Sequence, residues 1–492
     1  MMHRNLRQPS RWPRLFVLLS GFAVLMAAAG PSLAETSDSE ANFSLAGTWD
    51  GALTVPGGRL RLAFHFVEAD GGWSATLDSL DQGAMGIPAG GVSFEDGRLK
   101  VSVPAISGQY DGAFESADAI DGAWFQGGAR LELDLERRVE DSAPASDGGP
   151  ERPQDPEPPY PYLVQGVDFP SHADDVTLAG TLTVPEGAGP FPAVALISGS
   201  GPQDRDSFVL GHRPFLVLAD YLTRRGVAVL RYDDRGIGES TGDFAAATTR
   251  DFALDAAGAA AFLAGRDRIA AVGLVGHSEG GIVAPLVAAD GGAVDFVVLL
   301  APPAVTGRET LVDQGAAIFT AAGRPPEWVA EHRKIHDALF EAIVTDQTDA
   351  EIDKAIGALI DYQGGVGDAA ARQQQVEAQR RGLTGPWFRE MLTYDPAPTL
   401  SKVGQPVLAL FGAKDTQVTP ALHRPALEKA LAQNDRADVE TLAGLNHLFQ
   451  TAGSGLVVEY SQIDETFAPA ALDRIATWIL EQRPQASEAA NE

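Results

Sequence analysis

From about residue 161 onward, short apolar segments alternate with helical patterns, and this alternation limits the possible folds more than any other feature. The apolar runs have the length of strands; they read PAVALIS, VAVLRYD, AVGLVGH, FVVLLAPP and PVLALFG. Helical patterns such as PFLVLADYLTRR and FALDAAGAAAFLAGR lie between them. Buried strands that alternate with helices are typical of a mostly parallel sheet with helices on both faces. We therefore expect an α/β fold over residues 161–485, which begins with the strand-like pieces YLVQGVDF and VTLAGTLTV.

The alternation stops at about residue 306 and resumes at about residue 400. The segments ETLVDQGAAIFTAAG, PPEWVAEHRKIHDALFEAI and AEIDKAIGALIDY in this stretch are helical in pattern, and none resembles a strand. An insertion placed after a strand of such a sheet lies near the carboxyl ends of the strands, where ligands bind. We expect residues 306–400 to form a helical cap over that edge.

The chain before residue 161 differs in texture. Residues 35–140 contain short alternating segments with glycines every eight to twelve residues, which predicts a small antiparallel β domain. Residues 141–160 are rich in proline, acidic and small residues and predict an extended linker.

Residues 1–34 have the order of a secretory signal: four arginines, then LFVLLSGFAVLMAAA, then small residues at Ser32 and Ala34. We expect cleavage after Ala34 and an exported protein, periplasmic or extracellular. The alternative is an uncleaved anchor, which the interruption of the apolar run at Ser20 and Gly21 disfavours.

Charge and cysteine content exclude several classes of function. The net charge of −30 would become −34 after loss of the signal, and such a field opposes binding to nucleic acid or to anionic lipid. The chain has no cysteine, which excludes disulfides, thiolate metal sites and a cysteine nucleophile.

The pattern Gly-x-Ser-x-Gly occurs twice, around Ser278 and around Ser240. A nucleophilic serine on a sharp strand-to-helix turn needs a buried strand directly before it and a helix directly after it. Ser278 has AVGLV before and GIVAPLVAA after, whereas Ser240 follows the polar YDDRGI. We therefore predict that Ser278 is a nucleophile, with Gly276 and Gly280 relieving the crowding between strand and helix.

A serine hydroxyl needs a base, and the base needs an orienting acid; in this kind of fold they follow in the order Ser, acid, His. His447, in a loop after an apolar run, is the best base. His332 and His336 lie in the expected cap, and His423 follows too closely on the candidate acid. Asp415, after PVLALFG, is the preferred acid; Asp395 and Glu440 are alternatives.

Acyl transfer also needs donors for the tetrahedral oxyanion. The backbone N–H of Glu279, next after the nucleophile, is one candidate. The loop LISGSGPQDRD supplies the other, the N–H of Ser200, between Gly199 and Gly201. A phosphate-binding role for this loop is disfavoured, because no Lys-Ser or Lys-Thr follows.

His332 and His336 have the i, i+4 spacing of a metal pair. Because no third ligand follows in a recognisable pattern, we expect a solvated helix face and no metal site. The aromatic residues of the N-terminal unit are expected to pack in its core.

The motifs SGSGPQDRD, YDDRGIGES, GHSEGG, FGAKDTQV and GLNH, in this order, resemble the α/β-hydrolase superfamily and its secreted bacterial serine esterases. The resemblance covers roughly residues 161–484. It implies a triad of Ser278, Asp415 and His447, a cap that lines the acyl pocket, and no cofactor. The N-terminal unit resembles a domain found before such hydrolases, whose role this does not settle. Glu279 departs from many relatives, which are uncharged there; a carboxylate would slow the chemistry unless it pointed away.

The sequence therefore predicts an esterase acting on a small-molecule ester through an acyl-enzyme intermediate. The same triad would also serve a serine peptidase, aminopeptidase-like, with a site for a peptide amine. A non-catalytic envelope-binding protein, in which the β unit carries the function, is the other alternative. We expect no nucleic-acid partner and no membrane partner after cleavage of the signal, and the sequence gives no oligomeric state.

Overall fold

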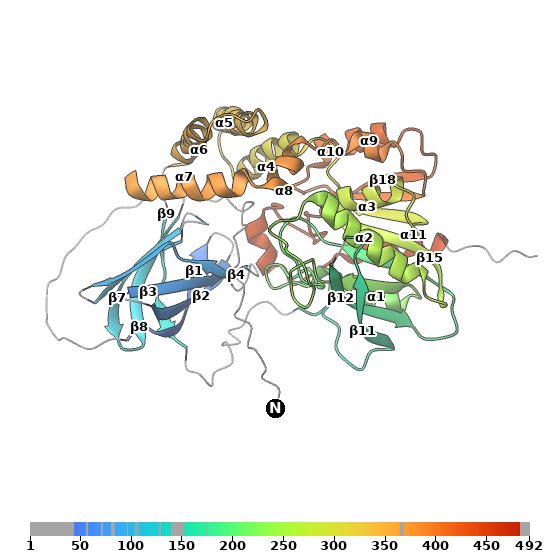
Figure 1. The fold of residues 1–492 in the computed structure, drawn as a ribbon, viewed down its shortest axis with the longest axis horizontal. Coiled ribbons are helices and arrows are strands. Elements are labelled where there is room, and N and C mark those ends of the chain that lie inside the picture. The colour runs from blue at the N-terminus through green and yellow to red at the C-terminus, as the bar shows by residue number, and fades with distance from the viewer. Residues whose placement is uncertain are drawn as a thin grey trace, which may run out of the picture.

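A computed structural model describes residues 44–138, 152–364 and 369–482, apart from short gaps at 56–57, 70–71, 80–83, 96, 104–105, 107, 127–128 and 174. The predicted signal peptide at residues 1–34 and residues 141–151 of the predicted linker lie outside the described residues. Figure 1 shows a β region, an α/β region and a group of helices above them.

In the described part of residues 44–138, strands form one antiparallel sheet in the order β4-β3-β2-β1-β10-β8-β7-β6-β5, with β9 paired to β8. Alternation explains its core: in β6 the residues Leu99, Val101 and Val103 are buried while Arg98 and Lys100 are exposed. The strands are β1 Gly47–Val55, β2 Gly58–Ala69, β3 Gly72–Ser79, β4 Ala84–Pro88, β5 Gly91–Glu95, β6 Arg98–Val103, β7 Gly108–Ser116, β8 Ala119–Gln126, β9 Ala129–Glu132 and β10 Leu135–Arg137.

The second sheet has the order β11-β12-β14-β13-β15-β16-β17-β18 in the described residues. β12 is antiparallel to both of its neighbours, and β13 to β18 pair in parallel. The strands are β11 Tyr162–Pro170, β12 Thr177–Pro185, β13 Phe191–Ile197, β14 Ala228–Tyr232, β15 Ile269–His277, β16 Phe296–Leu300, β17 Val407–Gly412 and β18 Ala437–Leu442. The apolar runs of the sequence coincide with β13 to β17.

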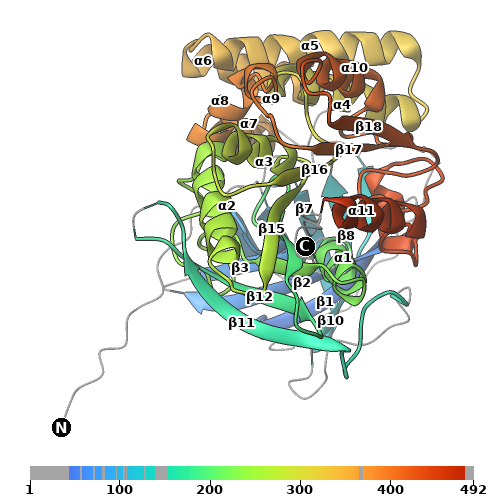
Figure 2. The ribbon, with the colours of Figure 1, turned by 90° about the vertical axis from the view of Figure 1, so that its right-hand side faces the viewer.

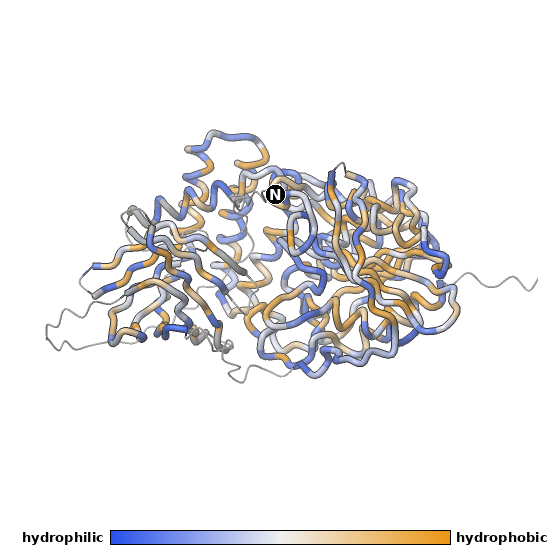
Figure 3. Tube along the Cα trace, turned by 60° about the horizontal axis from the view of Figure 1, so that its bottom comes forward, coloured by the Kyte–Doolittle hydropathy of each residue, from blue (hydrophilic) through white to orange (hydrophobic). Residues whose placement is uncertain are grey.

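Helices cover both faces of this sheet. Figure 2 shows α2 (Thr249–Ala264) and α3 (Gly280–Ala289) on one side, with α1 (Pro214–Arg224) and α11 (Pro469–Glu481) on the other. Apolar residues concentrate in the sheet between them (Figure 3). The α/β-hydrolase fold expected from the sequence is therefore confirmed. The remaining elements of this region are α10 (Pro420–Ala430) and the 3₁₀ helix η3 (Val457–Gln462).

A helical insertion separates β16 from β17 in the sequence, although the two strands pair directly. Its helices have an apolar core of their own, which includes Phe340, Ile356 and Phe388. Two of them begin at capping boxes, at Thr306 and at Thr348. The helices are α4 Gly307–Ala321, α5 Pro326–Val344, α6 Asp349–Tyr362, α7 Ala369–Leu383, α8 Pro386–Thr393 and α9 Ala397–Leu400. We refer to α4–α9 as the cap.

Residues 152–160, which belong to the predicted linker, lie against the α/β region. The Arg152 guanidinium donates to the carbonyls of Gly211, Ser461 and Ile463. Across the described ranges, none of the helices is long and apolar enough to cross a membrane.

Candidate active site

Ser278 lies at the turn between β15 and α3, as the sequence predicts. Its backbone adopts φ of 54°, a left-handed conformation that costs free energy in a residue with a side chain. The turn is fixed on both sides, because the Ser278 N–H donates to Leu300 O at 2.9 Å and the Gly281 N–H donates to Ser278 O at 2.8 Å. Such a turn holds the serine side chain at the carboxyl edge of the sheet.

The glycines on either side are required by close backbone approach. A Cβ at Gly276 would come within 2.0 Å of the Gly280 carbonyl oxygen, and one at Gly280 within 2.4 Å of Ile197 O. No real Cβ tolerates such contacts, so a side chain at either position would push the strand and helix apart. This is the crowding expected from the sequence.

Asp415 and His447 come together above the sheet. Asp415 follows β17 and His447 follows β18, and the distance from His447 Nδ1 to Asp415 Oδ2 is 2.7 Å. The other carboxylate oxygen accepts from the N–H groups of Gln417 and Val418 at 2.7 and 2.9 Å. Because a carboxylate accepts, Nδ1 carries the proton and Nε2 keeps its lone pair. The imidazole is thus arranged to accept a proton at Nε2.

The alternative acids and bases face elsewhere. Asp395 accepts from the N–H of Ala397 in its own turn, and Glu440 accepts from Arg474. His423 is fully buried and its Nδ1 accepts from the Ala304 N–H at 3.1 Å.

His277 joins the serine turn to the His447 loop, a role that our sequence reasoning missed. Its Nε2 donates to the carbonyl oxygen of His447 at 2.9 Å, and the two rings lie 4.7 Å apart. Burial lowers the pKa of His277 to about 3, so the ring is neutral at ordinary pH. The signal was present in the motif, because His277 is the polar residue that ends the strand beside Ser278.

Within the described residues, no hydrogen bond joins the Ser278 hydroxyl to His447. Hydrogen bonds of this kind are often long without substrate and tighten when it binds. The structure therefore brings Asp415 and His447 into direct contact and places His447 beside the serine turn through His277.

The loop after β13 lies against the serine. A Cβ built at Gly199 would be 3.1 Å from Ser278 Cβ, which places the neighbouring Ser200 at the edge of the turn. In the described part of the chain, the N–H groups of Ser200 and Glu279 donate to no protein acceptor.

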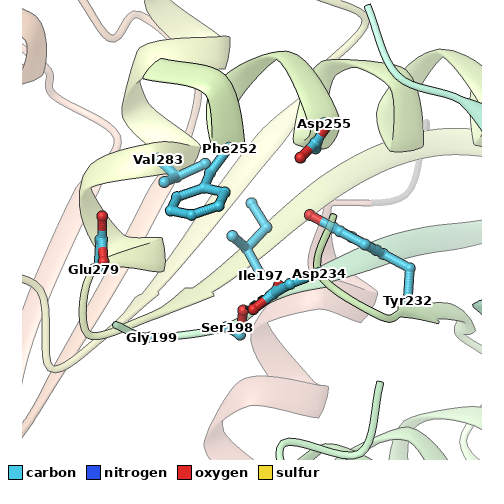
Figure 4. A pocket seen from close by; sticks show the side chains of 9 residues that line it. All are labelled: Ile197, Ser198, Gly199, Tyr232, Asp234, Phe252, Asp255, Glu279 and Val283. Atoms are coloured by element: carbon cyan, nitrogen blue, oxygen red, sulfur yellow. Dashed lines mark hydrogen bonds between the residues drawn. The ribbon is translucent and has the colours of Figure 1, made fainter. Parts of the chain in front are cut away.

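The Glu279 side chain points toward α2 and the cap. Figure 4 shows it on the wall of a small cavity that it shares with Asp234, Asp255 and Ser198. The cavity has room for about one water molecule, which makes it too small for a substrate. Burial raises the pKa of Glu279, and it also raises the pKa of Asp234, to about 8.

The solvated face expected for His332 and His336 is wrong. His332 is 1% exposed and stacks on Trp328, and the rings of both histidines face Gly315 of α4. Glycine at that position leaves room for them: its Cβ would lie 3.1 Å from each ring. Across the described ranges, no group of three or more potential ligands could hold a metal ion.

Comparison with known proteins gives one family model and one curated relative. The model of the family described as serine aminopeptidase, S33, matches residues 213–450. Esterase EstD of Thermotoga maritima is 28% identical over 309 residues, which are 62% of this chain. The match spans 65% of the length of that relative.

Solved structures of similar proteins include hydrolases of two kinds. An esterase of Pyrococcus furiosus has 15% identity and a TM-score of 0.41, over 65% of this chain and 92% of its own. Est1E of Butyrivibrio proteoclasticus, with ferulic acid bound, has 16% identity and a TM-score of 0.37, over 64% and 98%. A proline iminopeptidase of Mycobacterium smegmatis has 16% identity and a TM-score of 0.39, over 65% and 98%.

Proposed function

We propose that this chain, which has the fold of the α/β-hydrolases and matches the model of the family described as serine aminopeptidase, S33, is a serine hydrolase that cleaves carboxylic esters of small or medium acyl chains. The observation that carries the proposal is the 2.7 Å contact between His447 and Asp415, held beside the strained Ser278 turn. The curated relative, which is named an esterase, supports the choice of esters.

In the proposed reaction His447 Nε2 takes the proton of the Ser278 hydroxyl while its oxygen attacks the ester carbonyl carbon. Asp415 keeps the ring in the required tautomer and stabilises the imidazolium that forms. The N–H groups of Glu279 and Ser200 hold the oxyanion of the tetrahedral intermediate.

The intermediate then collapses. The C–O bond to the alcohol breaks, His447 returns its proton to the leaving oxygen, and the acyl group stays on Ser278 as an ester. Water, deprotonated by His447, attacks the acyl carbon, and breakdown of the second intermediate releases the acid and restores the Ser278 hydroxyl. No cofactor enters any of these steps.

The test is turnover of p-nitrophenyl acetate and butyrate by the wild type and by Ser278→Ala. We expect the substitution to abolish turnover while the melting temperature stays the same. Ser240→Ala, in the other Gly-x-Ser-x-Gly pattern, is the matched control and should keep kcat. Turnover by Ser278→Ala at the wild-type rate would reject the proposal, and a fluorophosphonate that labels a different residue would do the same.

A peptidase is the second candidate, because the matching family is described as serine aminopeptidase. Both reactions use the same nucleophile, so they differ only in substrate. Aminoacyl-nitroanilides compared with a chain-length series of p-nitrophenyl esters, at equal enzyme concentration, separate the two by their kcat/KM values.

We also propose that the protein is exported and loses residues 1–34. The basic, apolar and small-residue order of that segment supports this. N-terminal sequencing of exported protein should read from Glu35; a chain that begins at Met1 outside the cytoplasm would contradict it.

A further inference from the structure

The side chain of Glu279 is a buried carboxylate attached to the residue whose N–H is the proposed oxyanion donor. It is 4% exposed, and it accepts hydrogen bonds at one oxygen from the Thr249 hydroxyl at 2.7 Å and from the Trp387 indole N–H at 2.8 Å. The Ser200 hydroxyl lies close enough to this carboxyl to offset part of the rise that burial causes in its pKa. One oxygen of the carboxylate therefore has two donors.

These three groups come from separate parts of the fold. Thr249 is the first residue of α2, Trp387 lies in α8 of the cap, and Ser200 lies in the loop after β13. Ser200 carries the second proposed oxyanion donor. The side chain of the first donor residue is thus bonded to α2 and to the cap, and it lies close to the residue of the second donor.

The burial of this carboxylate needs an explanation, because its negative charge opposes the proposed reaction. Burying a carboxylate is unfavourable, and a negative charge near a developing oxyanion raises the barrier. A buried polar network holds its members in place when every member is bonded. The placement of two donors gains from that rigidity, since oxyanion stabilisation depends on distances of about 2.7–3.1 Å.

We propose that the Glu279 side chain is a positioning residue, which sets the distance between the N–H groups of Glu279 and Ser200 and makes that distance depend on the docked cap. This rests on the proposed hydrolase function. It goes beyond it by giving the cap a part in the chemical step through Trp387. It predicts that removing the network lowers kcat and leaves KM nearly unchanged, because the donors act on the intermediate more than on the bound ester.

Glu279→Leu and Glu279→Gln test the carboxylate. Leucine cannot accept a hydrogen bond, and we expect kcat to fall about 100-fold with KM within about 2-fold. Glutamine offers an amide oxygen to the Thr249 and Trp387 donors, so it should recover a large part of that loss. A trifluoromethyl ketone, which forms an oxyanion on Ser278, should bind more weakly to the leucine variant by a factor similar to the loss in kcat.

Trp387→Phe tests the cap. Phenylalanine keeps an aromatic ring and removes the indole N–H, and we expect kcat to fall several-fold. Trp328→Phe is the matched control, because Trp328 lies in α5 of the same cap and its ring stacks on Tyr362, away from Glu279. This control should keep kcat.

Three results would overturn the inference: unchanged kcat in Glu279→Leu, a fall in kcat that glutamine does not recover, or equal falls in Trp387→Phe and Trp328→Phe. If the leucine variant does not fold, the single variants Thr249→Val and Trp387→Phe test the inference instead. An unchanged kcat in both variants would overturn it. The rate of fluorophosphonate labelling of Ser278 is measured in the same variants. A wild type that is labelled but cleaves no ester would reject the esterase proposal, while the labelling rates would still decide the role of Glu279.

Discussion

Ser278 and Ser240 each lie between two glycines in the same five-residue pattern, yet their hydroxyl groups have different surroundings. The Ser240 hydroxyl is buried, donates to Asp233 O at 2.7 Å and accepts from the Ala179 N–H at 2.9 Å. The Ser278 hydroxyl has no such bonds to the described residues, and the neighbouring His277 bonds to the backbone carbonyl of His447. The Ser240 hydroxyl therefore stabilises its loop, whereas the Ser278 hydroxyl is not engaged in this way.

The glycines differ in the same way. Gly238 and Gly242 have φ of 53° and 108°, so they serve the backbone conformation of a loop. Gly276 and Gly280 serve the close approach of β15, α3 and β13. The same pattern of glycines around a serine therefore meets different structural requirements at the two positions. The secondary structure that flanks each pattern determines the requirement.

The largest expected effect comes from Asp415→Asn, which tests whether the surroundings of Ser278 make it reactive. Asparagine would present an N–H toward Nδ1 and favour the wrong tautomer of His447. We expect kcat/KM for p-nitrophenyl butyrate to fall about 10⁴-fold. Asp395→Asn, which changes a carboxylate that accepts from the Ala397 N–H in its own turn, should match the wild type. Equal kcat/KM values for Asp415→Asn and Asp395→Asn would show that the contact of Asp415 with His447 does not make Ser278 reactive.

Gly276→Ala tests the crowding at the Ser278 turn. The added methyl group would meet the Gly280 carbonyl, and we expect a loss of about 3 kcal/mol in the free energy of unfolding in urea. Gly404→Ala is the control, since its Cβ would meet nothing within 4 Å. The explanation is wrong if both variants unfold at the wild-type midpoint.

Ser240→Ala and Ser278→Ala test whether the Ser240 hydroxyl contributes to stability and the Ser278 hydroxyl to turnover. Ser240→Ala leaves the Ala179 N–H without its acceptor, and we expect a loss of about 2 kcal/mol of stability with kcat kept. Ser278→Ala should change stability by less than about 0.5 kcal/mol. Denaturation midpoints and kcat for each variant check this, and a reversed pattern would refute it.

A further prediction concerns how stability depends on pH through Asp234, which lies in the loop that carries Ser240. Burial raises the pKa of Asp234 to about 8, against 3.8 for an ordinary aspartate. Between these values the folded protein holds a proton that the unfolded chain has lost, so this contribution is full below pH 3.8 and disappears as the pH rises through about 8. We expect Asp234→Asn to flatten that decline. Melting temperatures measured every half pH unit from 5 to 9 would show it, and parallel curves would argue against it.

The sequence predicts much of the α/β region because burial on both faces leaves continuous apolar runs, which coincide with β13 to β17. Asp415 and His447 could be found because each follows such a run, where the side chains of parallel strands meet. The Glu279–Trp387 contact could not be found in this way. It joins residues 108 positions apart, and it depends on how the cap docks.

The cap histidines show a second limit of sequence reasoning. His332 and His336 lie on a helix rich in charged residues, which favours exposure. The burial of His332 and the packing of His336 beside it follow from Gly315 on another helix, where the missing side chain leaves room for two rings. Periodicity within one helix carries no information about a gap in its neighbour.

Because β16 pairs directly with β17, the ladder of residues 297–300 with residues 407–410 forms without help from the chain between them. The intervening helices could therefore be lengthened, shortened or replaced while β17, which precedes Asp415, keeps its register. A lineage could acquire new substrates by exchanging this one segment. Only a replacement segment that again supplies a hydrogen-bond donor to Glu279 would keep the contact between the cap and the Ser278 turn.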